Sequence, residues 1–325
     1  MSFDFHRQQG AIARGQWFSV THTHFYEQPS DDPGIPEIWC YTDAISYAPG
    51  EAVALHVSTS AETYSVEIVR DGHVPNTVFQ KKELKGALHA TPKRAYAEGC
   101  GWPKSLSWKI PEDAASGGYV VCARIITEGG QEIEQQAFFV VRGGKARAPI
   151  VLIAATATWT AYNDWGGANS YEGIDGESGN QFSPHLSLKR PWARGQIWLP
   201  VGAPRIPHHE MGFGSVPIYP AMNFAFAQGF AKYYAAAGWA SYERHFVEWA
   251  ERENIPFDIV SQHDLHDDST VLDGYSCAVI VGHDEYWSRE MRDHLDQWVE
   301  AGGNVARFGG NFIWQIRMEN DNQTQ

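Results

Sequence analysis

The chain has 325 residues, of which 43% are hydrophobic and 20% are charged, and its formal net charge is −14. This composition indicates a globular protein with a proper hydrophobic core and enough residues for two domains. The negative charge argues against nucleic acid or an anionic membrane as the main partner, and no apolar stretch is long enough to predict a membrane-spanning helix.

The start of the chain has no basic segment followed by an apolar one, so no signal peptide is predicted and we expect a cytoplasmic protein. Its four cysteines, Cys40, Cys100, Cys122 and Cys277, form no CxxC pair. We expect them to be small buried hydrophobic residues, with a Cys40–Cys122 or Cys100–Cys122 bridge as the minority alternative.

Residues 1–36 are polar and contain several prolines, which predicts an irregular N-terminal arm. From 37 to 144 apolar and polar residues alternate in short runs, and glycine or proline turns separate the runs. Examples are Val53, Leu55 and Val57, and later Tyr119, Val121, Ala123 and Ile125. Short strands of period two predict a β-sandwich domain of immunoglobulin-like type over 37–144.

From residue 150 the pattern changes to continuous apolar runs at 150–155, 257–261, 277–281 and 304–308. Helical patterns lie between them at 241–252 and after Ser288. The first has Tyr242, Phe246, Trp249 and Ala250 on one face, and the second has Met291, Leu295, Trp298 and Val299 on its buried face. Alternating strands and helices predict an α/β domain with a doubly wound parallel sheet over 150–325. Residues 156–240 are expected to form a layer over the strand ends.

Polar side chains follow two of these strands. His283 and Glu285 come directly after the run that ends at Gly282, and Asn311 follows Gly309-Gly310. Ligands bind at the carboxyl ends of parallel strands, so this edge is the predicted site. From spacing alone, Glu285 is equally well a metal ligand, an acid or base, or a helix cap, and His283 is equally well catalytic or structural. Asn311 is better explained by turn chemistry.

The first strand of the parallel sheet leads into a loop that should lie near the same edge. Its polar residues include Tyr162, Asn163 and Tyr171, although tyrosines at such positions are ordinarily packing residues. The run from His263 to Asp268 is interpreted as a solvated loop. The sequence has no GxSxG elbow, P-loop or HExxH motif.

Several segments together resemble the large, catalytic subunit of the N,N-dimethylformamidase family. They are Gly282-His-Asp-Glu-Tyr-Trp-Ser288, Phe308-Gly-Gly-Asn-Phe-Ile-Trp314, Ala161-Tyr-Asn-Asp-Trp-Gly-Gly167 and Ser187-Leu-Lys-Arg-Pro191. The resemblance runs from about residue 40 to residue 318. It implies that the parallel-sheet domain is similar to class I glutamine amidotransferases, without their cysteine, and that it is incomplete at its C-terminus.

The resemblance also implies a hydrolase that splits small linear amides such as N,N-dimethylformamide into an amine and a carboxylic acid. In that family mononuclear ferric iron is held by two tyrosinates and a glutamate. Glu285 and Tyr162 match two of these ligands, and His283 and Asn311 match catalytic residues beside the metal. A small subunit and a homo-oligomer are the implied partners.

The second tyrosine is not matched by the family pattern, because Trp192 stands where it is expected. Tyr171 and Tyr219 are the available substitutes. We assign Tyr219 to this ligand position and Asn163 and Tyr171 to substrate binding. Two alternatives to an amidase stay open: a non-catalytic binding or interaction module, and a protein that acts on sugars.

Overall fold

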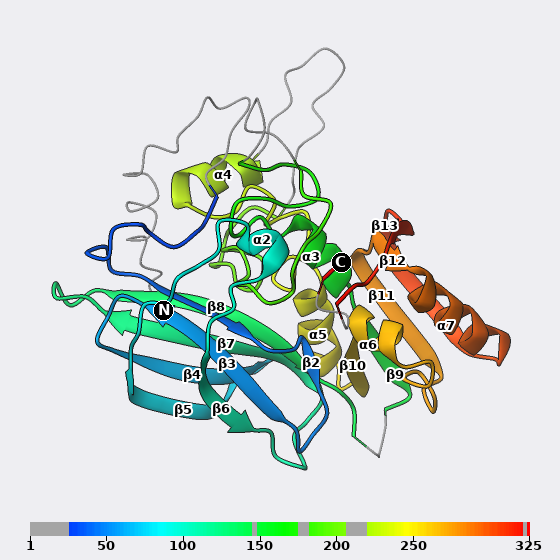
Figure 1. Ribbon diagram of the computed structural model, residues 1–325. Coiled ribbons are helices and arrows are strands. Elements are labelled where there is room, and N and C mark those ends of the chain that lie inside the picture. Colours follow the sequence, from blue (N-terminus) through cyan, green and yellow to red (C-terminus); the bar gives the residue numbers. More distant parts are fainter. Residues whose placement is uncertain (1–25, 145–147, 175–181, 206–219, 321–323) are drawn as a thin grey trace.

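The computed structural model describes residues 26–144, 148–174, 182–205, 220–320 and 324–325. These residues form a β-rich fold with few helices, in which a strand-rich N-terminal half lies beside a parallel sheet (Figure 1). The strands of the first half are β1 (Ile38–Thr42), β2 (Ser46–Tyr47), β3 (Ala52–Thr59), β4 (Thr63–Asp71), β5 (Asn76–Lys85), β6 (Lys104–Lys109), β7 (Gly117–Ile126) and β8 (Glu132–Val141), with α2 (Ala95–Glu98) between β5 and β6.

These strands form two sheets, a five-stranded one in the order β2-β8-β7-β4-β5 and a three-stranded one in the order β1-β3-β6. Side chains from both sheets meet in one hydrophobic core that includes Val53, Leu55 and Val57, as their alternation predicts. Strands β7 and β8 are buried on both faces, because Val120 and Phe138 point away from this core and pack against the parallel sheet. The two halves therefore share a continuous interior.

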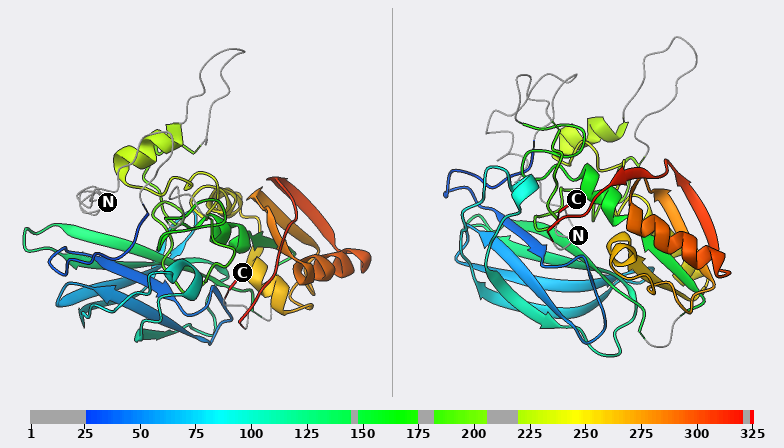
Figure 2. Two further views of the ribbon diagram at one scale, coloured as in Figure 1. Left: turned by 45° about the horizontal axis from the view of Figure 1, so that its top comes forward. Right: turned by 45° about the vertical axis from the view of Figure 1, so that its right-hand side comes forward.

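The second half contains a four-stranded parallel sheet in the order β10-β9-β11-β13. Its elements and their neighbours are β9 (Ile150–Ala154), α3 (Thr156–Tyr162), α4 (Pro220–Gln228), α5 (Glu243–Arg252), β10 (Phe257–Ser261), α6 (Gln262–Asp267), β11 (Cys277–His283), β12 (Tyr286–Ser288), α7 (Arg289–Glu300), β13 (Asn304–Gly310) and β14 (Trp314–Ile316). Figure 2 shows α7 on the side of this sheet that faces away from the strand-rich half. The immunoglobulin-like and doubly wound, amidotransferase-like assignments and the domain boundaries stay predictions.

Two helices lie in the segment 156–240, where the sequence pattern predicts only an irregular layer. Helix α3 follows β9 almost directly, and all seven of its residues are buried. Because it has no exposed face, it lacks the amphipathic period by which a surface helix is recognised in a sequence. The segment predicted to cover the strand ends therefore contains α3 and α4, while residues 182–205 contain no regular element.

The two predicted surface helices are present, but each buries a narrower stripe than the sequence indicates. Helix α5 buries Glu243, Val247 and Ala250, while Trp249 is 44% exposed. Helix α7 begins at a Ser288 cap, as predicted, but Val299 is 42% exposed. A helix on a single sheet face contacts it through about a third of its circumference, so apolar residues at the margin of the stripe stay in solvent.

The four cysteines are free. No helix in the described part of the chain is both long and apolar enough to cross a membrane.

Gly282 permits the sharp turn that follows the buried part of β11. Its φ is +71°, and an added Cβ would lie 2.3 Å from Cγ of Tyr242. Gly282→Ala should therefore lower the free energy of unfolding by roughly 2 kcal/mol or more, through backbone strain and overpacking. Gly310→Ala is the matched control on the neighbouring strand, because open space surrounds that position. Urea denaturation of both variants tests this, and equal losses of stability would contradict it.

Candidate active site

The carboxyl ends of β9, β11 and β13 converge at one edge of the parallel sheet, as the strand pattern predicts. His283 pairs in register with Gly310, so Asn311, the residue directly after β13, lies beside it. Tyr162 is the last residue of α3, the helix that follows β9. Segments that are distant in the sequence therefore bring Tyr162, His283, Glu285 and Asn311 into one cluster.

Three oxygen atoms lie at the centre of this cluster. The Tyr162 hydroxyl is 3.1 Å from Glu285 Oε2, and the Tyr171 hydroxyl is 2.7 Å from the Tyr162 hydroxyl and 3.0 Å from the same carboxylate oxygen. The Tyr286 hydroxyl donates to the Tyr171 hydroxyl at 2.7 Å. Two phenol oxygens and a carboxylate oxygen thus form a compact triangle, and a third phenol adjoins it.

His283 has a defined tautomer in this arrangement. Its Nδ1 lies 2.6 Å from the carbonyl oxygen of Ala236, which can only accept, so Nδ1 carries the hydrogen. Nε2 lies 3.0 Å from Asn311 Nδ2 and 3.2 Å from Glu285 Oε2. In the neutral ring Nε2 is the acceptor for the Asn311 amide, and in the protonated ring it donates to the carboxylate. The imidazole is therefore oriented with its basic nitrogen toward the oxygen cluster.

Burial keeps the phenols of the cluster protonated. It raises the pKa of Tyr162, Tyr171 and Tyr286 above the ordinary value, and the Glu285 carboxylate adds to this for Tyr162 and Tyr286. The neighbouring phenol Tyr162 further raises the pKa of Tyr171. Ionising any of these hydroxyls at neutral pH consequently requires a positive charge at the cluster.

A side chain of α3 fixes the position of the backbone at Glu285. The Thr158 hydroxyl accepts hydrogen bonds from the backbone amides of Glu285 and Tyr286, at 3.0 and 3.2 Å. Asn169 performs the same function for the second phenol, because its Oδ1 accepts from the amide of Tyr171 at 2.8 Å. Neither Thr158 nor Asn169 is indicated by the sequence pattern, since their role depends on contacts between distant segments.

The structure does not bring every predicted site residue to the cluster. The Asn163 side chain is buried elsewhere: its Nδ2 donates to the carbonyl of Pro191 at 3.0 Å and its Oδ1 accepts from the amide of Ala193 at 3.0 Å. Tyr219 lies outside the described residues. Trp192 packs against Trp159 in the hydrophobic core, with ring centroids 6.1 Å apart. The roles predicted for Asn163 and Tyr219 stay predictions.

Two aromatic residues of the cluster are missed by sequence reasoning. Tyr286 is part of the Gly282–Ser288 motif, so its position next to Glu285 was a usable signal. The Tyr233 ring lies 5.8 Å from the rings of both Tyr162 and Tyr171. It comes from an irregular segment, and its sequence position carried no such signal.

The donor set suits a hard metal ion better than a soft one, because it contains phenol and carboxylate oxygens. Oxygen ligands at about 2.0–2.2 Å from a metal are about 3 Å apart in an octahedral arrangement. The separations of 2.7, 3.0 and 3.1 Å in the triangle match this spacing. Within the described residues, no group of three or more His, Cys, Asp and Glu side chains could hold a metal, so any metal bound here would need the phenols.

Fold and cluster together define a β-rich protein with a partly exposed phenol–carboxylate–imidazole site at the edge of a parallel sheet. The chain belongs to the family described as N,N-dimethylformamidase beta subunit-like, C-terminal, whose model matches residues 65–325.

Two curated relatives are N,N-dimethylformamidase beta subunits. The protein from Alcaligenes sp is 24% identical and the one from Paracoccus aminophilus is 22% identical, and each match covers 76% of this chain and 31% of the relative. The chain therefore spans about a third of the length of these relatives.

Two solved structures have a weak similarity to this chain. The PmoD soluble domain from Methylocystis sp. covers 35% of this chain with 13% identity and a TM-score of 0.22. The β-glucuronidase of Parabacteroides merdae covers 83% of this chain with 12% identity and a TM-score of 0.24, and 24% of that enzyme is matched. TM-scores at this level do not indicate a shared fold.

Asp284 anchors the turn that carries His283 and Glu285. Its side chain is 1% exposed, and it forms a 2.6 Å ion pair with Arg307 and accepts from the Gln262 amide at 2.7 Å. Asp284→Ala should lower the free energy of unfolding by about 3–5 kcal/mol, because Arg307 and Gln262 lose a buried partner. Asp293→Ala removes an exposed pair with Arg289 and should cost about 0.5 kcal/mol. Denaturant titrations compare the two; similar losses would contradict a supporting role of Asp284.

The buried side chain of Glu243 forms hydrogen bonds with residues at the start of α3. Its Oε1 accepts from the amide of Ala155 at 3.0 Å and from the Trp159 indole at 3.1 Å. Burial raises the pKa of Glu243 to about 8, whereas the unfolded chain titrates near about 4.3. The folded state therefore binds the proton more tightly, and this contribution to stability is lost as the pH rises from about 4 to 8.

Glu243→Gln should remove this pH dependence, because the amide stays neutral throughout. The stability of the variant relative to the unsubstituted protein should rise steadily between pH 5 and pH 8. Urea denaturation at pH 5, 6.5 and 8 measures the difference. A constant difference over this range would show that Glu243 is already ionised in the folded state at pH 5.

Proposed function

We propose that this chain is part of an amidohydrolase that splits small linear amides, such as N,N-dimethylformamide, into an amine and a carboxylic acid. The observation that carries the proposal is the cluster of Tyr162, Tyr171, Glu285 and His283 in a chain of the dimethylformamidase family. Family membership supports amide hydrolysis in general, and the substrate is part of the proposal.

We further propose that mononuclear ferric iron is the cofactor, held by Tyr162, Glu285 and a second tyrosine. Among the described residues Tyr171 is the better candidate for that second ligand, because its hydroxyl is within 3.0 Å of both other oxygens. This would move Tyr171 from substrate binding to metal binding, and Tyr219 stays the competing candidate. When bound, a ferric ion polarises an amide carbonyl and acidifies water.

His283 and Asn311 can assist the proton transfer that amide hydrolysis requires. His283 presents its Nε2 lone pair to the cluster, so it can accept a proton from an attacking water and return it to the leaving amine. Asn311 Nδ2 donates to this nitrogen in the absence of substrate. It can donate instead to a substrate oxygen once His283 is protonated, and this exchange fits the predicted catalytic roles of both residues.

The proposal also covers the type of subunit, the domains and the partners of this chain. The chain would correspond to the large, catalytic subunit of such an enzyme, with an immunoglobulin-like sandwich before an amidotransferase-like catalytic domain. The curated relatives are named as subunits, which supports a small subunit as partner, and a homo-oligomer and a cytoplasmic location are further parts of the proposal.

Substitution of single hydroxyls distinguishes the ligands. Tyr171→Phe should weaken iron binding by roughly a hundredfold or more, and should shift or abolish a tyrosinate-to-iron absorption band in the visible spectrum. Tyr286→Phe is the matched control, because it removes a phenol that contacts Tyr171 and not the Glu285 oxygen. It should change iron affinity by about tenfold or less.

The readouts are iron content per chain, the visible spectrum, and amine release from small amides. Purified protein that takes up no iron would overturn the metal assignment. An unchanged band in Tyr171→Phe would return the ligand position to Tyr219. Iron uptake without amine release from any small linear amide would favour the non-catalytic binding module.

A further inference from the structure

The side chain of Arg307 joins the two strand ends that carry the candidate site. Its Nη1 donates to the carboxylate of Asp284 at 2.6 Å, and its Nη2 donates to the backbone carbonyl of the same residue at 3.3 Å. The same Nη2 donates to the carbonyls of Gly310, at 3.4 Å, and of Asn311. Asp284 directly follows β11 and Gly310 ends β13. One guanidinium therefore holds the backbone of both strands where they leave the sheet.

These contacts lie directly beside three residues of the site. Asp284 stands between His283 and Glu285 in the sequence, and Asn311 accepts from Arg307 through its own carbonyl. The Nδ2 of Asn311 lies 3.0 Å from Nε2 of His283. A shift of the guanidinium would change the separation of these two side chains, because the backbone on each side is attached to it.

The turn that carries Asn311 has a strained backbone. The φ angles of Asn311 and Ile313 are +41° and +56°, in the left-handed region that residues other than glycine rarely adopt. Such angles persist only where surrounding contacts fix them. The amide of Trp314 closes the far end of the turn by donating to the Glu285 carbonyl at 2.5 Å. At the near end, the contacts of Arg307 supply the corresponding constraint.

The shape of the Arg307 guanidinium matters here as well as its charge. A guanidinium is a planar fork of five donors and can reach a carboxylate and several carbonyls at once, whereas an ammonium is a compact point charge. The Phe312 ring lies under this plane, with its centroid 4.0 Å from Cζ of Arg307, and favours it by a cation–π contact. A salt bridge with Asp284 needs only the carboxylate, so the three carbonyl contacts require another explanation.

From this combination we propose that Arg307 is a positioning residue of the site. Through the backbone of the turn after β13, it fixes the amide of Asn311 against the imidazole of His283. Its charge pair with Asp284 is a separate contribution, to stability. The positioning can be measured without substrate or metal, and only its consequence for catalysis rests on the proposed function.

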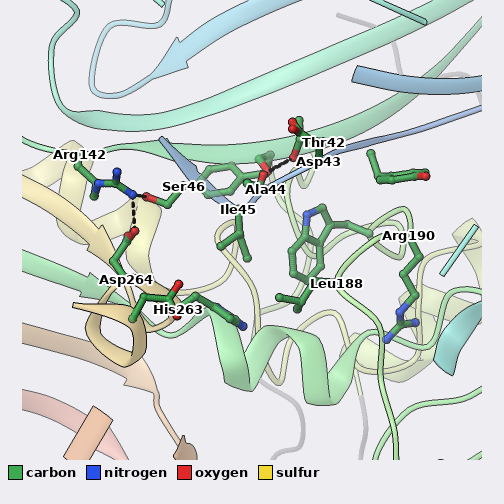
Figure 3. Close-up of a pocket in the computed structure, with 14 residues that line it drawn as sticks. Thr42, Asp43, Ala44, Ile45, Ser46, Arg142, Leu188, Arg190, His263 and Asp264 are labelled. Atoms are coloured by element: carbon green, nitrogen blue, oxygen red, sulfur yellow. Dashed lines mark hydrogen bonds and ion pairs between the residues drawn. The ribbon is translucent and has the colours of Figure 1, made fainter. Parts of the chain in front are cut away.

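A second arginine of the chain offers a matched control. Arg142 pairs with Asp264 at 2.5 Å, and the Asp264 side chain is 8% exposed, so this pair also joins an arginine to a buried carboxylate. Figure 3 shows the pair beside a cavity near His263, and none of the described residues that line this cavity belongs to the cluster around Glu285. Arg142→Lys therefore removes a guanidinium fork elsewhere in the molecule.

The surroundings of this control pair differ from the sequence-based expectation. The run that begins at His263 is expected to be a solvated loop, and that expectation is wrong: residues 262–267 form α6, and His263 is 4% exposed. A capping box between Ser261 and Asp264 starts the helix directly after β10. The carboxylate that Arg142 contacts is therefore held on a regular element, as the Arg307 partner is held at a strand end.

The test follows the ¹⁵N signal of Nε2 of His283 in the full chain, labelled in its histidine rings. The measurement is made at about pH 8, where an ordinary histidine ring is neutral, after treatment with a chelator. The signal reports the hydrogen bond that Nε2 accepts, and Asn311→Ala gives its position without that donor. Arg307→Lys keeps a positive charge beside Asp284 but removes the fork. It should produce at least about half of the shift seen in Asn311→Ala, and Arg142→Lys should produce none.

The double variant Arg307→Lys/Asn311→Ala separates positioning from a direct effect on the ring. If Arg307 acts through Asn311, its substitution adds no shift of the His283 signal once the Asn311 side chain is gone. A further shift in the double variant would show that Arg307 acts on His283 by another route. That result, or an unchanged signal in Arg307→Lys, would overturn the proposal.

Phe312→Leu tests the same arrangement without changing the charge pair. It removes the ring under the guanidinium, and because Phe312 is 53% exposed the variant should fold normally. The His283 signal should move in the same direction as in Arg307→Lys. Phe308→Leu is the control, because Phe308 is 69% exposed and successive side chains of a strand point to opposite faces. If urea denaturation shows that Arg307→Lys is unfolded, the Phe312→Leu signal decides, and its constancy would overturn the proposal.

Amine release from N,N-dimethylformamide provides a second readout. Under the proposed function, Arg307→Lys should lower kcat and kcat/KM equally, by about tenfold or more, because Asn311 would be misplaced in the transition state. Full activity of this variant would contradict the positioning role. A shifted His283 signal in a protein that releases no amine even when unsubstituted would support the positioning role and contradict the proposed function.

Discussion

The buried helix α3 is the element on which the phenol cluster and the interior between the halves depend. Its seven residues contact the strand-rich half, the parallel sheet and the irregular segments, and none reaches solvent. The Trp159 ring lies 5.4 Å from Phe138 of β8 and 6.5 Å from Trp239. Displacing α3 would therefore disturb the packing of both halves at once, because a close-packed interior transmits such shifts.

Although α3 is buried among apolar residues, its polar side chains form hydrogen bonds with residues of neighbouring segments. Thr156 at one end contacts His263, Thr158 holds the amides of Glu285 and Tyr286, and Tyr162 at the other end enters the phenol cluster. A rigid helix of seven residues spans about 10 Å. One short element thus makes polar contacts along its whole length, and the carboxylate of Glu243 at the start of that element is itself held by backbone and indole donors.

Electrostatic conditions differ between the two ends of α3. At the phenol cluster one carboxylate lies among hydroxyls whose pKa values are raised by burial, so added positive charge would be stabilised there. At the other end Thr156 contacts the ring of His263, whose pKa is lowered by burial to about 4, so this ring is neutral at physiological pH. Only the end at the phenol cluster is therefore suited to a cation, because buried charge is stable only beside a partner.

Much of the scaffold was predictable from the sequence. The alternating strands, the parallel strand segments, the cap at Ser288 and the meeting of His283, Glu285 and Asn311 follow from local patterns and from the geometry of parallel sheets. Helix α3 was not predictable in this way, because a fully buried helix has no polar face to reveal its period. Tyr171 was named as a site residue, but its distance to Glu285 depends on a turn closed by Asn169.

The sequence by itself determined the strand ends and the polar residues that follow them, because side-chain direction and strand length are local properties. Tertiary structure decided which phenols join Glu285, which backbone groups the Asn163 side chain contacts, and how His263 becomes buried. Those outcomes depend on hydrogen bonds and packing between segments up to more than a hundred residues apart, such as Thr158 with Glu285. No local pattern of residues encodes such contacts, since their energy exists only after the chain has folded.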